Sequence, residues 1–209
     1  MTRDCIIRLA RPEEERATED LVRRSFWNVY RPGCLEHYLL HCLRRDPAFV
    51  GELDLVMEKD GVPVGQNVFV KTVIVADSGD EIPVLTMGPI CIAPELQGRG
   101  CGKLLLDTSL EAAARMGFGA VLLEGNIGFY GKSGFSYAKG FGIRYNGLPE
   151  DADTSFFLAR ELLPGYLKGV RGRYVTPPGY YVSPEETELF DAEFPKLPKL
   201  RLPGQLFGE

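Results

Sequence analysis

Apolar positions in the first half of the chain change from a helical to an alternating period. Up to residue 43 they cluster at helical spacing, as in Leu21, Val22 and Phe26, and so form one helix face. From Leu53 onward they alternate with polar residues, which is typical of strands joined in an antiparallel hairpin. The expected elements are a strand at 5–9, a helix beginning near Pro12 and broken by Pro32-Gly33, a helix at 35–43, and strands at 53–58, 62–75 and 84–92.

The second half contains a helix followed by strands. A glycine-rich loop over residues 94–102 comes first, and the segment 103–116 then has a helix-forming composition with Gly117 as its C-cap. Gly-Pro in the middle of the preceding strand, at Gly88-Pro89, indicates a bulge. The expected strands are at 120–123, at 135–145 with interruptions at Gly140 and Gly142, at 155–158 and at 173–175.

Beyond Thr176 the chain becomes rich in proline, which excludes a long regular helix or a central strand. Tyr180, Tyr181 and Phe190 in this stretch favour docking on the rest of the chain, or on a second subunit, over disorder. We therefore expect one domain over residues 1–175 and a proline-rich extension over residues 176–209.

Composition and charge narrow the class of protein. The chain of 209 residues is 44% apolar and 25% charged, as in soluble globular proteins. Its formal net charge of −5 does not favour nucleic-acid binding or attachment to anionic membranes, so we expect neither as a partner. Five cysteines without a CxxC pair predict reduced thiols, and no run of 18 apolar residues or signal peptide is visible, which together predict a cytoplasmic location.

The glycine-rich loop has the features of an anion site. Its core, residues 97–103, reads Gln-Gly-Arg-Gly-Cys-Gly-Lys and lies directly between a strand and a helix. Glycines let the backbone approach a phosphate, and the first N–H groups of a helix point outward with a favourable dipole. The dinucleotide pattern GxGxxG would need glycine at Lys103, and the phosphate-loop pattern would need glycine at Gln97. Both nucleotide motifs therefore fail.

Two motifs resemble those of the GNAT superfamily of acyl-CoA-dependent N-acetyltransferases. Residues 97–102 resemble its Q/R-x-x-G-x-G/A motif, and residues 129–135, Phe-Tyr-Gly-Lys-Ser-Gly-Phe, resemble its Y-x-x-x-G-F motif. The resemblance extends over roughly residues 4–175 and is closest to a branch of predicted acetyltransferases similar to the bacterial YhbS proteins. It implies a mixed α/β (α+β) fold: a mostly antiparallel twisted sheet, flanked by helices, with a V-shaped split between the strands ending at Ala93 and Glu124.

The resemblance also implies acetyl-CoA as co-substrate, bound without a metal. Backbone groups of Ile90, Cys91 and Ile92 would pair with pantetheine in the split, and Lys132 could contact the CoA phosphates or be solvated. Asn126 belongs to the same expected cofactor-binding set. Backbone N–H groups of the glycine loop would hold the pyrophosphate: Gln97, Gly98, Arg99, Gly100, Cys101, Gly102 and Lys103.

The reaction implied is direct attack of a primary amine, on a small molecule or a peptide, on the acetyl-CoA thioester in a ternary complex. Tyr130 is the expected general acid for the departing thiolate. An amine is mostly protonated at pH 7, so a base is needed, and Glu124 is the candidate, with Glu52 and Asp54 as alternatives. A homodimer is compatible with the aromatic extension. The alternative function is a non-catalytic acyl-CoA-binding or regulatory module, against which Tyr130 argues.

Two histidines, His37 and His41, lie four residues apart on an expected helix, with Cys34 and Cys42 nearby. Zinc would need further ligands at a regular spacing, and the sequence offers none. We therefore expect no metal site.

Overall fold

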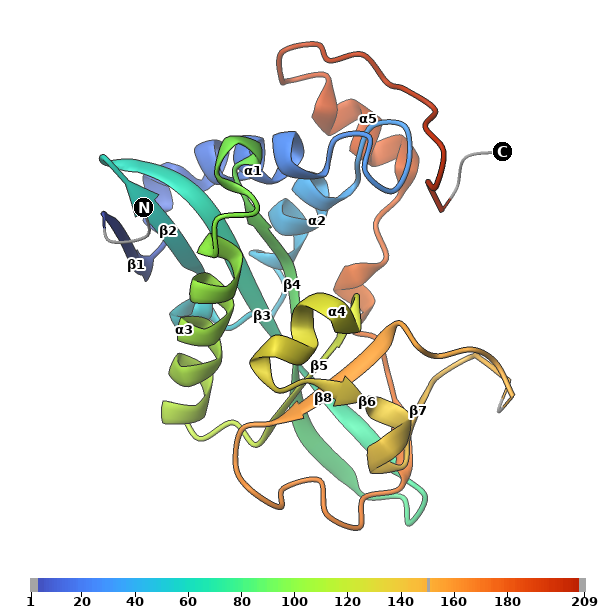
Figure 1. Cartoon of the computed structure of the whole chain (residues 1–209). Helices are drawn as coiled ribbons and strands as arrows, with labels where there is room; N and C mark the ends of the chain where they lie inside the picture. Colours follow the sequence, from blue (N-terminus) through green and yellow to red (C-terminus); the bar gives the residue numbers. More distant parts are fainter. Residues whose placement is uncertain (1–3, 150, 207–209) are drawn as a thin grey trace. The chain divides into compact units, whose positions relative to one another are not determined.

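The structure, a computed structural model, describes residues 4–149 and 151–206 (Figure 1). The chain divides into two compact units, and the division falls within β3 (Val62–Ala76), β4 (Glu81–Ile92) and α3 (Cys101–Arg115). Unit 1 comprises Met1–Val68, Pro89–Leu105 and Pro178–Glu209, and unit 2 comprises Phe69–Gly88 and Leu106–Pro177. Throughout the described ranges, every helix is too short or too polar to cross a membrane.

Unit 1 contains three helices that pack together: α1 (Glu15–Phe26), α2 (Glu36–Leu43) and α5 (Pro184–Asp191). Helices α1 and α2, in blue in Figure 1, lie side by side, and α5 contacts α2. The predicted apolar stripes supply the packing face, since Leu21 and Val22 of α1 and Leu40 and Leu43 of α2 are buried. Helix α5 begins at Pro184 after the N-cap Ser183, and its short length suits the proline-rich stretch around it.

The strands of unit 1 form the antiparallel arrangement predicted by the alternating pattern. Strand β1 (Cys5–Leu9) pairs with β2 (Leu55–Lys59), and β2 pairs with the beginning of β3. The predicted strand at 53–58 starts later, because Gly51–Leu53 form a 3-10 turn. A Cβ on Gly65 would lie 2.7 Å from Cδ1 of Ile92 and 3.1 Å from Cβ of Met57, so only glycine allows this close packing.

The strands of unit 2 pair in both directions. Strand β4 pairs in parallel with β5 (Ala120–Glu124), and β5 pairs antiparallel with β8 (Phe157–Glu161), which also pairs with β6 (Ser136–Tyr137). Strand β7 (Ile143–Tyr145) lies parallel to β9 (Gly172–Tyr174), which is antiparallel to the end of β3. The hydrogen-bonded order is β1-β2-β3-β4-β5-β8-β6, with β9 joining β7 to β3. The predicted mixed, mostly antiparallel sheet flanked by helices is confirmed, whereas the V-shaped split stays a prediction.

The core of unit 2 is a cluster of aliphatic and aromatic side chains from these strands. Phe157 of β8 and Tyr174 of β9 are buried in it, with ring centroids 5.1 Å apart. The remaining buried members are Ile74, Val84, Ala120, Leu122, Ala138, Ile143, Ala159 and Leu167.

The strand predicted over residues 135–145 is interrupted around Gly140 and Gly142 as expected, but the two halves are separate strands. The chain forms two short strands there, β6 and β7, separated by a 3-10 turn at Ala138–Phe141. Gly142 has a φ of +81°, in the left-handed region, and so forms one of the predicted interruptions. Helix α3 begins at Cys101, two residues before the predicted start, so Cys101 and Gly102 belong to its first turn.

Candidate functional site

The glycine loop of unit 1 joins β4 to α3. After Ala93 the chain makes a 3-10 turn at Pro94–Leu96 and then passes Gly98 and Gly100, whose φ angles are +70° and +85°. No atom lies within 4 Å of a Cβ built on either glycine. These glycines are therefore needed for their left-handed backbone and not to avoid a neighbouring side chain. They leave an open backbone surface directly before the first turn of α3.

The start of α3 presents backbone donors next to this surface. The first intrahelical bond runs from the N–H of Leu104 to the carbonyl of Gly100, at 3.1 Å. N–H groups that precede it, such as those of Cys101 and Gly102, have no acceptor within the helix. Arg99 is exposed beside them. Together with the helix dipole, these groups favour an anion.

The side chain of Gln97 fastens the loop to the end of β4. Its Nε2 donates to the carbonyl of Ile92 at 3.0 Å, and Oγ of Ser25 donates to the same carbonyl at 3.2 Å. The sequence motif had assigned Gln97 only a backbone contact with the pyrophosphate. Its side chain instead fixes where the loop leaves the strand.

Backbone groups at the end of β4 alternate in direction. The N–H of Ala93 donates to the carbonyl of Val64 in β3, at 2.8 Å. In a strand, the backbone N–H and C=O groups of every second residue point to the same side. The backbone groups of Cys91 therefore point toward β3, like those of Ala93, and the backbone groups of Ile90 and Ile92 point away from β3. Of the three predicted pantetheine partners, Ile90 and Ile92 therefore have the suitable direction. Burial raises the pKa of Cys91 to about 12, so its thiol stays protonated and is no nucleophile.

The second motif lies in unit 2, directly after β5. Asn126 is the N-cap of the short helix α4 (Ile127–Tyr130), and its Oδ1 accepts from the N–H of Gly128 at 2.7 Å. The predicted cofactor residue Asn126 thus has a local structural task. Lys132 follows in a 3-10 turn and is exposed.

Tyr130 is held in place by its near neighbours in the chain. A Cβ on Gly125 would lie 2.3 Å from Cε2 of Tyr130, so the ring rests against this glycine. The ring also makes edge-to-face contacts with Phe129 and Phe135, with centroids 4.9 and 5.6 Å away. Gly134, with a φ of +81°, makes the turn that returns Phe135 to Tyr130. The Y-x-x-x-G-F motif is therefore a compact unit that orients the tyrosine.

Glu124 is exposed at the end of β5 and receives a hydrogen bond that the sequence did not reveal. The hydroxyl of Tyr145 in β7 lies 2.6 Å from Oε1 of Glu124 and donates to it. The same hydroxyl lies 3.0 Å from Oγ1 of Thr176. Tyr145 is 21 residues away in sequence and belongs to a strand that the alternating pattern had merged with β6. The bond orients the carboxylate of Glu124.

The other candidate bases are in unit 1. Asp54 accepts from Nε of Arg44 at 2.9 Å and from Nε2 of Gln66 at 2.6 Å. Arg44 is 4% exposed, so Asp54 serves to neutralise a buried cation and is not available as a base. Glu52 is exposed. Glu124 is thus the candidate with both exposure and a defined orientation.

The two histidines of α2 pack against the C-terminal segment. His37 is fully buried, with its ring 5.5 Å from that of Phe190 and 5.4 Å from that of Phe194. His41 places Nδ1 2.8 Å from Oε1 of Glu19. In the part of the chain that the structure describes, no three or more His, Cys, Asp or Glu side chains come together to hold a metal.

Cys34, His37 and Asp191 lie next to one another in the order of a catalytic triad, with a thiol, an imidazole and a carboxylate. Sγ of Cys34 lies 3.3 Å from Nδ1 of His37, and Nε2 of His37 lies 3.2 Å from Oδ1 of Asp191. Burial raises the pKa of the Cys34 thiol well above its usual range. A buried, protonated thiol cannot attack a substrate, so this cluster is structural.

The burial of His37 predicts a loss of stability in mild acid. Burial lowers the pKa of His37 to about 4, with Arg23 and Arg16 adding to the effect and Asp191 opposing it. The unfolded chain binds this proton near pH 6.5, so stability present above pH 6.5 falls as the pH drops toward 4. Urea unfolding at pH 7 and pH 5 should show this decrease. His37→Gln should reduce the decrease and His41→Gln should keep it; equal behaviour of the two variants would contradict the assignment.

Comparison with known proteins places the chain in a family. The sequence profile of the Acetyltransferase (GNAT) family matches residues 12–135, which include both motifs. The chain belongs to this family. Its relatives include the uncharacterized N-acetyltransferase YhbS of Escherichia coli K12, which is 26% identical over 168 residues, or 80% of this chain and 93% of YhbS.

Solved structures show the same GNAT fold. The crystal structure of E. coli YhbS in complex with CoA matches with a TM-score of 0.73 and 24% identity, over 85% of this chain and 92% of that one. A GNAT family acetyltransferase of Brucella melitensis in complex with acetyl-CoA matches with a TM-score of 0.67 and 22% identity, over 85% and 98%. The predicted family, its YhbS-like branch and the fold class are confirmed.

Proposed function

We propose that this GNAT protein transfers the acetyl group of acetyl-CoA to a primary amine of a small molecule or a peptide. The main support for the proposal is the loop of unit 1. There Gly98 and Gly100, both with left-handed φ angles, leave the backbone accessible directly before the first turn of α3. The YhbS and Brucella structures, which contain CoA and acetyl-CoA, support the choice of co-substrate.

The residues of the loop fit a pyrophosphate. Gly98 and Gly100 remove the side chains that would obstruct it, and backbone N–H groups of residues 98–102 supply donors. The N–H of Gln97 instead donates to the carbonyl of Pro94 at 3.3 Å. Each charge-assisted hydrogen bond contributes about 1.5–3 kcal/mol, so a few of them suffice despite the net charge of −5. Ile90, through its N–H and C=O, and Ile92, through its N–H, offer the backbone groups for the pantetheine amides, whereas the carbonyl of Ile92 is held by Gln97 and Ser25. Acetyl-CoA supplies the acyl group in activated form, as a thioester.

Two residues of unit 2 move the protons of the reaction. Glu124 takes a proton from the ammonium group of the acceptor, so that the neutral amine can attack. Tyr130 gives its phenolic proton to the departing thiolate, which becomes the free thiol of CoA. The attacking nitrogen loses its remaining extra proton to solvent, and solvent returns a proton to the tyrosine. The products are the N-acetylated amine and the free thiol of CoA.

The first experiment is thermal unfolding of the full chain with and without acetyl-CoA. A ligand at 100 times its Kd stabilises the folded state by about 2.7 kcal/mol. Acetyl-CoA and CoA should both raise the Tm, whereas NAD and ATP should not. The absence of a shift with acetyl-CoA at millimolar concentration would contradict the cofactor assignment. A shift would justify a screen of amines that detects the released thiol.

Gly100→Val should weaken CoA binding at least tenfold, with little change in overall folding. Valine at a φ of +85° is strained, because a β-branched residue is disfavoured in the left-handed region, and relief of the strain would move the loop backbone. Titration calorimetry with CoA measures the change. Gly140→Val is the matched control, since Gly140 has no left-handed φ and no atom within 4 Å of its Cβ position. Wild-type CoA affinity in Gly100→Val would exclude the loop as the CoA site.

Glu124→Gln tests the base. General-base catalysis contributes about 10²- to 10⁴-fold, so kcat/KM at pH 7 should fall within this range for the best acceptor of the screen. The deficit should shrink as the pH rises, because more of the acceptor amine is then already neutral. Glu52→Gln should behave like the wild type. A Glu124→Gln enzyme with an unchanged pH–rate profile would remove Glu124 from the mechanism.

A further inference from the structure

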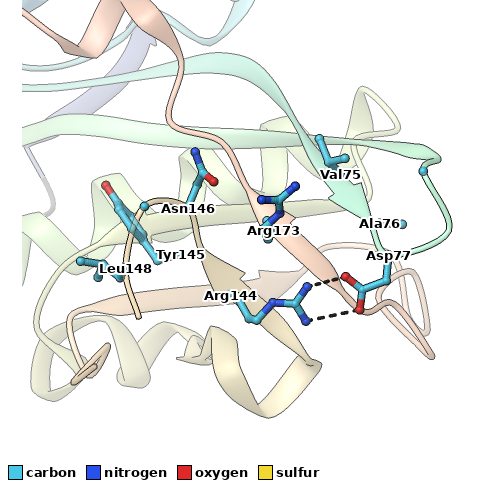
Figure 2. Close-up of a pocket in the computed structure, with 10 residues that line it drawn as sticks. Val75, Ala76, Asp77, Arg144, Tyr145, Asn146, Leu148 and Arg173 are labelled. Carbon is cyan, nitrogen blue, oxygen red and sulfur yellow. Dashed lines mark hydrogen bonds and ion pairs between the residues drawn. The ribbon is translucent and has the colours of Figure 1, made fainter. Parts of the chain in front are cut away.

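Two arginines lie side by side on the outer face of the β7–β9–β3 ladder in unit 2. The register pairs Arg144 with Arg173, and Arg173 with Val75, so these three side chains share one face (Figure 2). Their strand neighbours Ile74 and Tyr174 turn to the opposite face, where they are buried in the core. The outer row therefore has two cations directly opposite each other.

Neighbouring charges in this region do not balance. Like charges in directly opposed cross-strand positions are destabilising. Asp77 forms an ion pair with Arg144, drawn as dashed lines in Figure 2. Arg144, Arg173 and Arg171 together hold the pKa of the Asp77 carboxyl below its usual range. Within residues 4–149 and 151–206, Arg173 and Arg171 form no ion pair, although both act electrostatically on Asp77.

These side chains line a cavity. It has a volume of about 580 Å³ and is bordered by Asp77, Arg144, Arg173, Asn146 and Leu148, among others (Figure 2). This volume lies within the range of small-ligand sites, roughly 300–1,000 Å³. The turn after β7 closes one side, where the N–H of Asn146 donates to the carbonyl of Tyr174 at 3.1 Å. The cavity thus combines room for a ligand with an excess of positive charge.

We propose that this cavity binds a small ligand through an oxyanion group, a carboxylate or a phosphate. Arg173 is the principal contact and Arg144 the second, because a planar guanidinium can hold two oxygens of such a group at once. The bound anion would offset the like charges of Arg144 and Arg173, which lie directly opposite each other. The inference goes beyond acetyl transfer, since neither arginine has a part in the proposed reaction.

The test is titration calorimetry of the full chain, at low salt, with inorganic phosphate and with succinate as probes. Arg173→Gln should weaken binding at least tenfold, because it removes a charge-assisted contact. Asp77→Asn should strengthen binding, because it removes a competing carboxylate. Arg115→Gln is the control and should bind like the wild type, since Arg115 is an exposed arginine that pairs with Glu111 at 3.9 Å in α3.

The outcomes distinguish a phosphate ligand from a carboxylate ligand, and binding in the cavity from binding at the glycine loop. Binding of phosphate alone identifies a phosphate-bearing ligand, and binding of succinate alone identifies a carboxylate-bearing one. If neither probe binds, or if Arg173→Gln binds both probes as the wild type does, the proposal is wrong. If phosphate binds only at the glycine loop, Arg173→Gln should bind phosphate as the wild type does, because Arg173 is not part of that loop. A failure of acetyl-CoA to bind would leave the proposal intact.

Discussion

Tyr130→Phe is expected to lower kcat by about 10²- to 10⁴-fold while leaving CoA affinity unchanged. The substitution removes only the hydroxyl and keeps the ring, which rests on Gly125 and meets Phe129 and Phe135 edge to face. The phenylalanine ring should therefore keep its position, so that the loss reports proton transfer. Steady-state release of the CoA thiol, together with titration calorimetry of CoA, separates the two quantities.

The matched control is Tyr137→Phe. Tyr137 lies in β6, close to Tyr130 in sequence, and its side chain is 46% exposed. It should show wild-type kcat. An unchanged kcat in Tyr130→Phe would remove Tyr130 from the mechanism. If the wild type binds CoA but acetylates no amine of a broad screen, the non-catalytic acyl-CoA-binding module becomes the better account.

Asp191→Asn is expected to destabilise the protein by about 3–5 kcal/mol, because it leaves a buried guanidinium without its counter-ion. Asp191 accepts from Nε of Arg23 at 2.6 Å, and the side chain of Arg23 is only 1% exposed. The pair fastens α5 to α1. The free energy of unfolding in urea measures the loss, and limited proteolysis should show easier cleavage in the C-terminal segment.

Asp20→Asn is the matched control for this experiment. Asp20 pairs with Arg24 of the same helix at 2.8 Å, but the two side chains are 34% and 43% exposed. Such exposed pairs contribute about 0–1 kcal/mol, so this variant should unfold nearly as the wild type does. Equal stabilities of the two variants would contradict the role given to the buried pair.

The parts of the candidate site that depend on local backbone angles were predictable from the sequence. Gly98 and Gly100 adopt the left-handed φ that makes the loop before α3, and Gly134 adopts the φ of +81° that closes the turn around Tyr130. Only glycine adopts a left-handed φ at low energetic cost, so a glycine in a motif indicates where the backbone can turn. The same reasoning holds at Gly142, whose φ of +81° marks one of the interruptions expected in the 135–145 stretch.

The contacts between distant segments were not predictable, because alternation specifies which face a residue occupies but not which strand lies beside it. Tyr145 donates to Glu124, and Arg144 lies opposite Arg173, only because β7 pairs with β9 in one register. The spacing of His37 and His41 indicated a shared face, and both rings do contact Phe190, with centroids 5.5 and 4.5 Å away; that this face packs on α5 depends on the fold.

The amino-acid sequence by itself determined the family, the mixed α/β class, the order of most elements and the two glycine motifs, since periodicity and left-handed glycines act within a few residues. The tertiary structure alone decided the hydrogen bond that orients Glu124, the buried Arg23–Asp191 pair and the cationic cavity. Each of these joins residues far apart in the chain. Their meeting depends on strand register and helix packing, which are properties of the whole fold and of no short segment.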